Sequence, residues 1–229
     1  MEREGRSADK TPDPFLNKQQ VPSMEELLIG FDIREMWLPA WPPQRQLTYC
    51  LRPDIEKVLS ADSLVWPSVF DLEPDLRRPA GYCFVQDLWG DLKSMIEAGC
   101  AGQVGPDKLS WIIAIVFVPD MSKADALPFW ASEPRITSPS ALDSRWEFLG
   151  YDVADDFLLS GLSNCGYSPD TYSAQLRQQW ASHLNKYHLF CDLSHAKDFR
   201  NLSDARVPEH SPFFLYSLWT VRERIITHG

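Results

Sequence analysis

The sequence predicts an α+β fold, in which helices pack on a mainly antiparallel sheet within a single domain. Three observations lead to this prediction: stretches that alternate apolar and polar residues, one apolar run rich in β-branched residues, and segments with apolar residues at helical spacing. The composition, 44% hydrophobic and 24% charged, is typical of a folded domain. We expect residues 23–229 to form this domain and residues 1–22, which are rich in proline and charge, to form a flexible leader.

The first third of the chain is expected to contain two strands. Residues 27–37 alternate apolar and polar side chains, which is the period-two pattern of a half-buried strand. Residues 47–51 form a plausible partner strand. Residues 53–59 begin with proline and form a candidate helical turn. The proline-bearing stretch 60–80 is expected to be a loop.

The middle of the chain is expected to supply one helix and two strands. Residues 87–98 carry apolar side chains at helical spacing and end before a glycine, a common helix terminator. Residues 109–118 are rich in β-branched residues and apolar on both faces, as in the centre of a covered sheet. A loop is expected at 120–142. Residues 145–153 then alternate apolar and charged side chains, which predicts a strand in which Gly150 can mark a bulge.

The last part of the chain is expected to add a helix and a final strand. Ser-Pro-Asp at 168–170 is a helix-opening signal, and an apolar or aromatic residue follows at every fourth position, which predicts an amphipathic helix over 169–187. Residues 192–206 are a polar segment for which no element is predicted. Residues 212–221 fit either a helix or a strand, and their aromatic and β-branched content favours a strand.

Charge and hydropathy exclude several kinds of partner. With 22 Lys and Arg against 32 Asp and Glu, the net charge is −10, whereas nucleic-acid binding needs clustered positive charge. The longest apolar run, residues 111–118, is far shorter than the roughly 20 residues of a membrane-spanning helix. The N-terminus lacks a signal-peptide core, and the five cysteines do not form a disulfide pattern. We therefore expect a cytoplasmic protein that binds neither nucleic acid nor a membrane.

Four potential zinc ligands lie within thirteen residues: His183, His188, Cys191 and His195. Structural zinc sites usually present two compact ligand pairs, and this spacing does not provide them. Metal binding at these four residues is the less favoured of two interpretations. Ordinary packing is the favoured interpretation, and we expect neither a metal nor another cofactor.

Signals for catalysis are weak. Cys165 lies between small residues and could be a nucleophile served by a distant histidine, but no family signature surrounds it. The segment 161–163 lacks the second glycine of a nucleophile elbow. We therefore expect a non-enzymatic protein, and the alternative is a small-molecule hydrolase that uses Cys165 or a histidine.

An acidic stretch without Lys or Arg lies between Arg145 and Arg177. It is either a solvated face or a surface that holds a basic partner through acidic side chains and aromatic anchors. Three tryptophans in proline-bearing loops are expected to be exposed and to serve as further anchors. The candidate partner-binding residues are Glu147, Asp152, Asp155, Asp156, Tyr151, Trp130, Trp66 and Trp41.

Two stretches, RWEFLGYDVADDFLLSGLSNCGY at 145–167 and VPEHSPFFLYSLW at 207–219, resemble immunity proteins of bacterial polymorphic toxin systems. The resemblance implies a cytoplasmic, acidic protein that binds one cognate toxin domain and blocks its active site. Such toxins are delivered by contact-dependent or type VI secretion. The other alternative is an adaptor or chaperone for a secreted effector.

Overall fold

The computed structural model describes residues 25–35, 58–66, 68, 88–101, 110–120, 127–132, 142–164 and 174–221. The strands in these ranges are β1 (Leu27–Glu35), β2 (Ser110–Val118), β3 (Glu147–Ala154) and β4 (Phe214–Val221). The helices are α3 (Leu92–Ala101), α4 (Ala174–Ala181) and α5 (Leu193–Arg206), with a 3-10 turn, η2 (Phe129–Ser132).

The strands form one sheet in the order β1-β2-β4-β3, and every neighbouring pair is antiparallel. With helices packed on this sheet, the predicted α+β fold class is confirmed. β2 pairs with both β1 and β4, and the side chains of residues 112–118 are almost entirely buried. This explains why the sequence of β2 is apolar on both faces: a central strand is covered from both sides.

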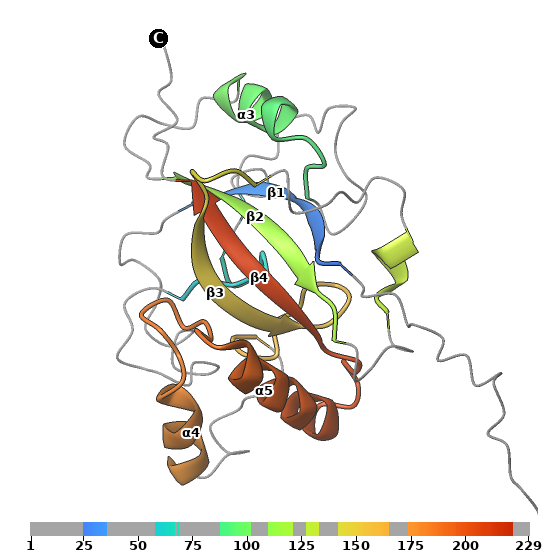
Figure 1. Ribbon diagram of the computed structural model, residues 1–229, viewed down its shortest axis with the longest axis vertical. Helices are drawn as coiled ribbons and strands as arrows, with labels where there is room; N and C mark the ends of the chain where they lie inside the picture. The colour runs from blue at the N-terminus through green and yellow to red at the C-terminus, as the bar shows by residue number, and fades with distance from the viewer. Residues whose placement is uncertain are drawn as a thin grey trace, which may run out of the picture.

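Side chains alternate between two faces of the sheet. We call the face on which α3 and α5 pack the helix face, and the opposite one the loop face. In Figure 1, α3 lies toward the top of the view and α5 toward the bottom, and β2, β4 and β3 are seen between the two helices. The core of the loop face contains Ile113, Ile115, Phe117, Tyr216 and Leu218; the helix face carries Ile112, Ala114 and Val116 beside α3, and Val118 and Leu215 beside α5.

A bulge interrupts β3, as Gly150 led us to expect. The pairing with β4 shifts between Phe148 and Gly150, and Gly150 has a φ of 145°. A β-carbon built on Gly150 would lie 2.6 Å from the Cβ atom of Leu189. Only glycine fits there without displacing the segment that packs on β3.

The helix predicted over 169–187 ends earlier in the structure, at Ala181. Residues 184–190 instead form a turn, in which the side-chain oxygen of Asn185 accepts the N–H groups of Tyr187 and Leu189. This side chain gives the backbone an alternative to helical hydrogen bonds. The helix predicted over 87–98 begins later, at Leu92, and its predicted end before Gly99 is wrong, since it continues through this glycine to Ala101.

α5 lies in the polar segment for which no element was predicted. Asp192 caps it by accepting the N–H groups of Ser194 and His195. Its buried residues, Ala196, Phe199, Arg200 and Ser203, follow helical spacing, although two of the four are polar. The strand predicted at 47–51, most of the turn at 53–59 and the leader at 1–22 lie outside the described residues.

The helices in the described part of the chain are too short or too polar to cross a membrane.

Candidate functional site

Asp152, in the acidic stretch, points into the loop face and is buried. Its carboxylate accepts four hydrogen bonds: from the hydroxyls of Ser60 at 2.7 Å and Ser160 at 2.8 Å, and from the N–H groups of Ala61 at 2.9 Å and Val153 at 2.8 Å. Burial raises the pKa of Asp152, although these hydrogen bonds lower it in part. This carboxylate therefore organises the interior.

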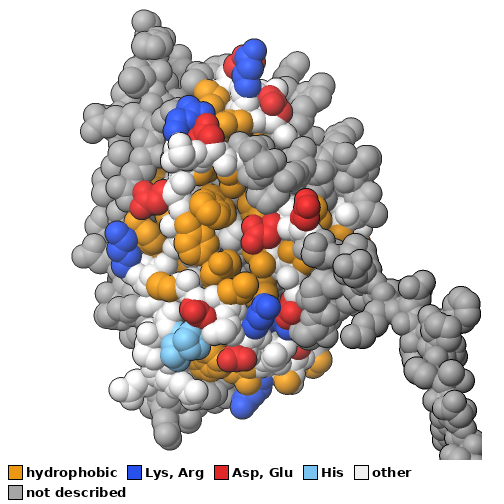
Figure 2. Space-filling model, viewed as in Figure 1, with side chains coloured by type: hydrophobic (Ala, Val, Ile, Leu, Met, Phe, Trp, Pro, Cys, Tyr) orange, Lys and Arg blue, Asp and Glu red, His pale blue; other side chains and the backbone are white. Residues whose placement is uncertain are grey.

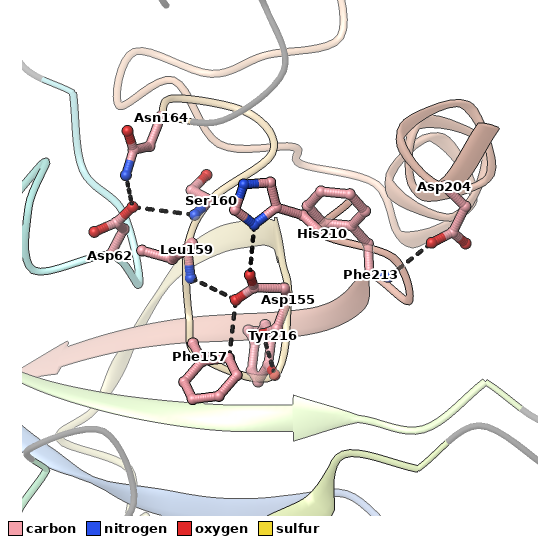
Figure 3. A network of polar contacts seen from close by, with 10 residues as sticks. All are labelled: Asp62, Asp155, Phe157, Leu159, Ser160, Asn164, Asp204, His210, Phe213 and Tyr216. Carbon is pink, nitrogen blue, oxygen red and sulfur yellow. Dashed lines mark hydrogen bonds and ion pairs between the residues drawn. The ribbon is translucent and has the colours of Figure 1, made fainter. Parts of the chain in front are cut away.

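A second buried carboxylate, Asp62, lies beside Ser160. It accepts the N–H group of Leu64 at 2.8 Å. It also accepts the N–H group of Ser160 at 3.1 Å and the side-chain amide of Asn164 at 2.6 Å (Figure 3). Burial raises the pKa of Asp62 too. Ser160 thus joins both carboxylates, one through its hydroxyl and the other through its backbone, and connects residues 58–66 to the segment after β3.

Arg34 of β1 brings a buried positive charge to the same side of the sheet. Its Nε atom lies 2.5 Å from an Asp32 oxygen, and its guanidinium donates to the carbonyls of Trp66 and Ala61. Asp32 also accepts the hydroxyl of Ser68 at 2.6 Å. Since both charges are almost fully buried, the pair attaches residues 61–66 and Ser68 to β1.

Asp155 lies directly after β3 and holds the next turn. Its Oδ1 atom accepts the N–H groups of Phe157 at 2.8 Å and Leu159 at 2.9 Å, and its Oδ2 atom lies 3.1 Å from Nδ1 of His210 (Figure 3). The Tyr216 hydroxyl donates to the Asp155 carbonyl at 3.0 Å. The side chain of His210 is about one-third exposed, so its ring reaches the surface.

These positions correct part of the sequence interpretation. Asp152 and Asp155 are buried, so the expectation that they form an acidic surface is wrong. Each lies inside because hydrogen-bond donors surround it. Of the acidic candidates, Glu147 is exposed and Asp156 half-buried. Burial, with the neighbouring charge of Asp155 as a smaller cause, raises the pKa of Asp156.

The expectation that Trp66 and Trp130 are exposed is also wrong, since both are buried. Trp130 packs edge-on against Phe117 of β2 at 5.4 Å and donates its indole N–H to the carbonyl of Asp156. Residues 58–66 and 127–132 pack over the loop face, where these wide aromatic rings cover apolar side chains of the sheet. Trp41 lies outside the described residues.

An aromatic patch, which sequence reasoning missed except for Tyr151, occupies the helix face. It consists of Phe148, Tyr151 and Trp219, whose ring centroids lie 4.9 Å apart for Phe148 and Tyr151 and 5.2 Å for Phe148 and Trp219. Phe148 is 37% exposed, and the other two are half-buried. Figure 2 shows hydrophobic side chains gathered over the middle of this face, with acidic and basic side chains around them.

Two acidic side chains act on Tyr151 of the aromatic patch. Partial burial raises the pKa of the Tyr151 hydroxyl, and the negative charges of Glu26 and Asp192 raise it further. Glu147 is exposed, but as the neighbour of Phe148 in β3 it points to the opposite face of the sheet. Hydrogen bonds from Ser194 lower the pKa of Asp192, so this carboxylate is charged at neutral pH. Glu26 precedes β1 and Asp192 caps α5, so carboxylates from two distant segments act on one side chain.

The histidines and cysteine weighed as zinc ligands lie near α5. His183 and His195 stack with ring centroids 3.8 Å apart, His188 is buried, and Cys191 is exposed. Nitrogen lone pairs lie in the plane of an imidazole, so two stacked rings do not converge on one ion. Within the ranges described, no three His, Cys, Asp or Glu side chains are grouped in a way that could hold a metal.

Of the residues considered for catalysis, Cys165 lies outside the described residues. The Ser163 hydroxyl donates to the Ser60 hydroxyl at 3.2 Å and so extends the network around Asp152.

No protein-family model matches the sequence, and neither a curated protein nor a solved structure matches it significantly. The function must therefore be inferred from the chemistry of the chain itself.

Proposed function

We propose that this chain is a non-enzymatic inhibitor, of the immunity-protein kind that its sequence resembles, which binds one basic toxin domain and blocks its active site. The observation that supports the proposal best is the aromatic patch, which is partly exposed and whose Tyr151 experiences the negative charges of Glu26 and Asp192. Aromatic side chains dominate the binding energy of many interfaces, and complementary charge increases the association rate. The proposal places the protein in the cytoplasm, with no cofactor.

Several of the candidate partner-binding residues are buried, so we assign the contact with the toxin domain to a different set of residues. Glu147, Tyr151 and Asp156 remain candidates, because each has exposed or half-exposed area. Phe148 and Trp219 join them as ring neighbours in the aromatic patch. The buried candidates act indirectly, by holding the loop face and the turn after β3 in place.

The test is calorimetric binding to the toxin domain encoded beside this gene, together with protection of cells that express that domain. Replacing both Phe148 and Tyr151 by alanine should weaken binding at least tenfold, which corresponds to about 1.4 kcal/mol. Phe157→Ala is the matched control, because Phe157 is 59% exposed and makes its ring contact with Phe129, outside the aromatic patch. Unchanged affinity in a folded double variant would place the interface elsewhere.

Two other outcomes would favour the alternatives. A complex in which the toxin domain stays active would indicate an adaptor or chaperone. The hydrolase alternative has one observation in its favour, the pairing of Asp155 with Nδ1 of His210, since a carboxylate in this position can orient a general base. Loss of protection in a His210→Ala variant that still binds the toxin domain would support that alternative.

A further inference from the structure

The aromatic patch depends on an irregularity of the backbone. Phe148 and Tyr151 are three residues apart, so in a regular strand they would point to opposite faces. The bulge at Gly150 shifts the register: Phe148 pairs with Trp219, and Tyr151 with Ser217, two residues of β4 on the same face. One extra residue in β3 therefore brings Phe148, Tyr151 and Trp219 together.

The aromatic patch is also held in place before any partner arrives. The indole N–H of Trp219 donates to the Ser217 hydroxyl at 3.0 Å, which fixes the orientation of that ring on the sheet. Phe148 contacts both other rings, so the three form a continuous surface. A preorganised surface loses little conformational entropy when it binds a ligand.

The negative charge beside these rings comes from carboxylates that other parts of the chain hold in place. Tyr151 pairs with Phe190, two residues before Asp192, so the cap of α5 lies near the edge of the aromatic patch. Asp192 accepts hydrogen bonds from the first turn of α5, and its negative charge, with that of Glu26, raises the pKa of the Tyr151 hydroxyl. Arg145, which precedes the β3 aromatics in the chain, has its guanidinium engaged by Asp143 at 2.9 Å. The surface thus offers π-faces and nearby carboxylates to a cation from outside.

We infer that the aromatic patch receives an arginine side chain of the bound protein, with its guanidinium stacked on the rings near the acidic helix cap Asp192. The identification of the bound protein as a toxin domain rests on the proposed function. A guanidinium is planar and weakly hydrated, so it can lie on an aromatic ring and still donate hydrogen bonds in its own plane. A lysine ammonium is compact and strongly hydrated, and it fits this arrangement less well.

The direct test uses the full chain and three synthetic peptides, Ac-GRGRG-NH2 and its versions with lysine or citrulline in place of arginine. Citrulline keeps the shape of arginine but is neutral. Binding is followed by NMR through the indole N–H signals and the ring signals of the aromatic patch. The arginine peptide should bind about fivefold or more tightly than the lysine peptide, and the citrulline peptide should not bind measurably. Equal affinity for arginine and lysine peptides, or no shift of the patch signals, would overturn the inference.

Two variants separate the aromatic contribution from mere apolar contact. Phe148→Leu keeps an apolar side chain but removes the π-face, and it should weaken binding of the arginine peptide about five- to tenfold while thermal stability stays close to that of the wild type. Asp192→Asn removes a charge and keeps a good helix cap, so it should weaken arginine binding without unfolding α5. Wild-type affinity in both variants would contradict the inference.

The failure of this inference can be told apart from failure of the proposed function. If the arginine peptide does not bind the aromatic patch but Phe148→Ala with Tyr151→Ala abolishes toxin binding, the arginine anchor is wrong and the inhibitor proposal stands. If the peptide binds and toxin binding is unaffected by the double variant, the cation site stands and the proposed interface is wrong.

Discussion

At the scale of single residues, the acidic side chains have two different environments. Asp152 and Asp62 are buried and surrounded by donors, whereas Glu147, Glu26 and Asp192 lie at the surface. A buried carboxylate costs desolvation energy and is stable only with several hydrogen bonds. The interior acids therefore hold the fold, and the surface acids keep their contact with solvent.

The role of Asp152 leads to a stability prediction. Asp152→Ala removes the acceptor of four hydrogen bonds and leaves two buried hydroxyls and two buried N–H groups without it. The free energy of unfolding, measured by urea denaturation, should fall by about 2–4 kcal/mol. The control is Asp198→Ala on the exposed side of α5, which should change it by less than about 0.5 kcal/mol. A similar effect of both variants would show that the network is not structural.

The sequence could indicate acidic residues here but not their burial. Alternation in β3 correctly implies that Tyr151 and Asp152 face opposite sides, yet it does not tell which side is covered. The donors that surround Asp152, in residues 60–61 and at Ser160, come from distant or irregular segments. A local sequence pattern cannot predict hydrogen bonds between residues so far apart in the chain.

At the scale of elements, β3 depends on its bulge. Gly150→Ala would place a methyl group 2.6 Å from the Cβ atom of Leu189 and force a side chain into a backbone conformation that strongly favours glycine. The variant should lose about 1–3 kcal/mol of stability, and the near-UV circular dichroism of the aromatic rings should change. Gly161→Ala is the comparison, since its methyl group would meet only the ring of Phe213, at 2.9 Å. Wild-type stability of Gly150→Ala would show that the bulge relaxes freely.

Residue periodicity predicts the strands correctly but misses one helix. The strands β1, β2, β3 and β4 were all predicted, because alternation or an apolar run is a local property of the chain. α5 was missed because its buried stripe includes Arg200 and Ser203. Arg200 can be buried only because Asp120, at the end of β2, lies 2.7 Å from it, and this contact spans eighty residues of sequence.

At the scale of the whole molecule, the carboxylates give stability a pH dependence with two opposing parts. Burial raises the pKa of Asp62 and Asp152, so the folded state takes up these protons at a higher pH than the unfolded chain does. Their contribution is therefore complete below the ordinary pKa of 3.8 and is lost as pH rises through the folded values. Hydrogen bonds lower the pKa of Asp91, Asp143 and Asp192, which stabilise above 3.8 and lose that contribution as pH falls.

We therefore expect the free energy of unfolding to increase as pH is lowered from neutral toward about 4, and to decrease below that. Urea denaturation at half-unit pH intervals measures this profile. Asp62 and Asp152 dominate the change in unfolding free energy between neutral pH and about 4. The three acids with lowered pKa values contribute less, because they lie at the surface, where solvent screens their interactions. In Asp152→Asn the rise between neutral pH and 4 should become shallower, since the group that takes up the proton is gone, while the decrease below 3.8 should remain. If the wild-type profile is flat between pH 7 and 4, or if Asp152→Asn leaves its slope unchanged, Asp152 takes up no proton in that range.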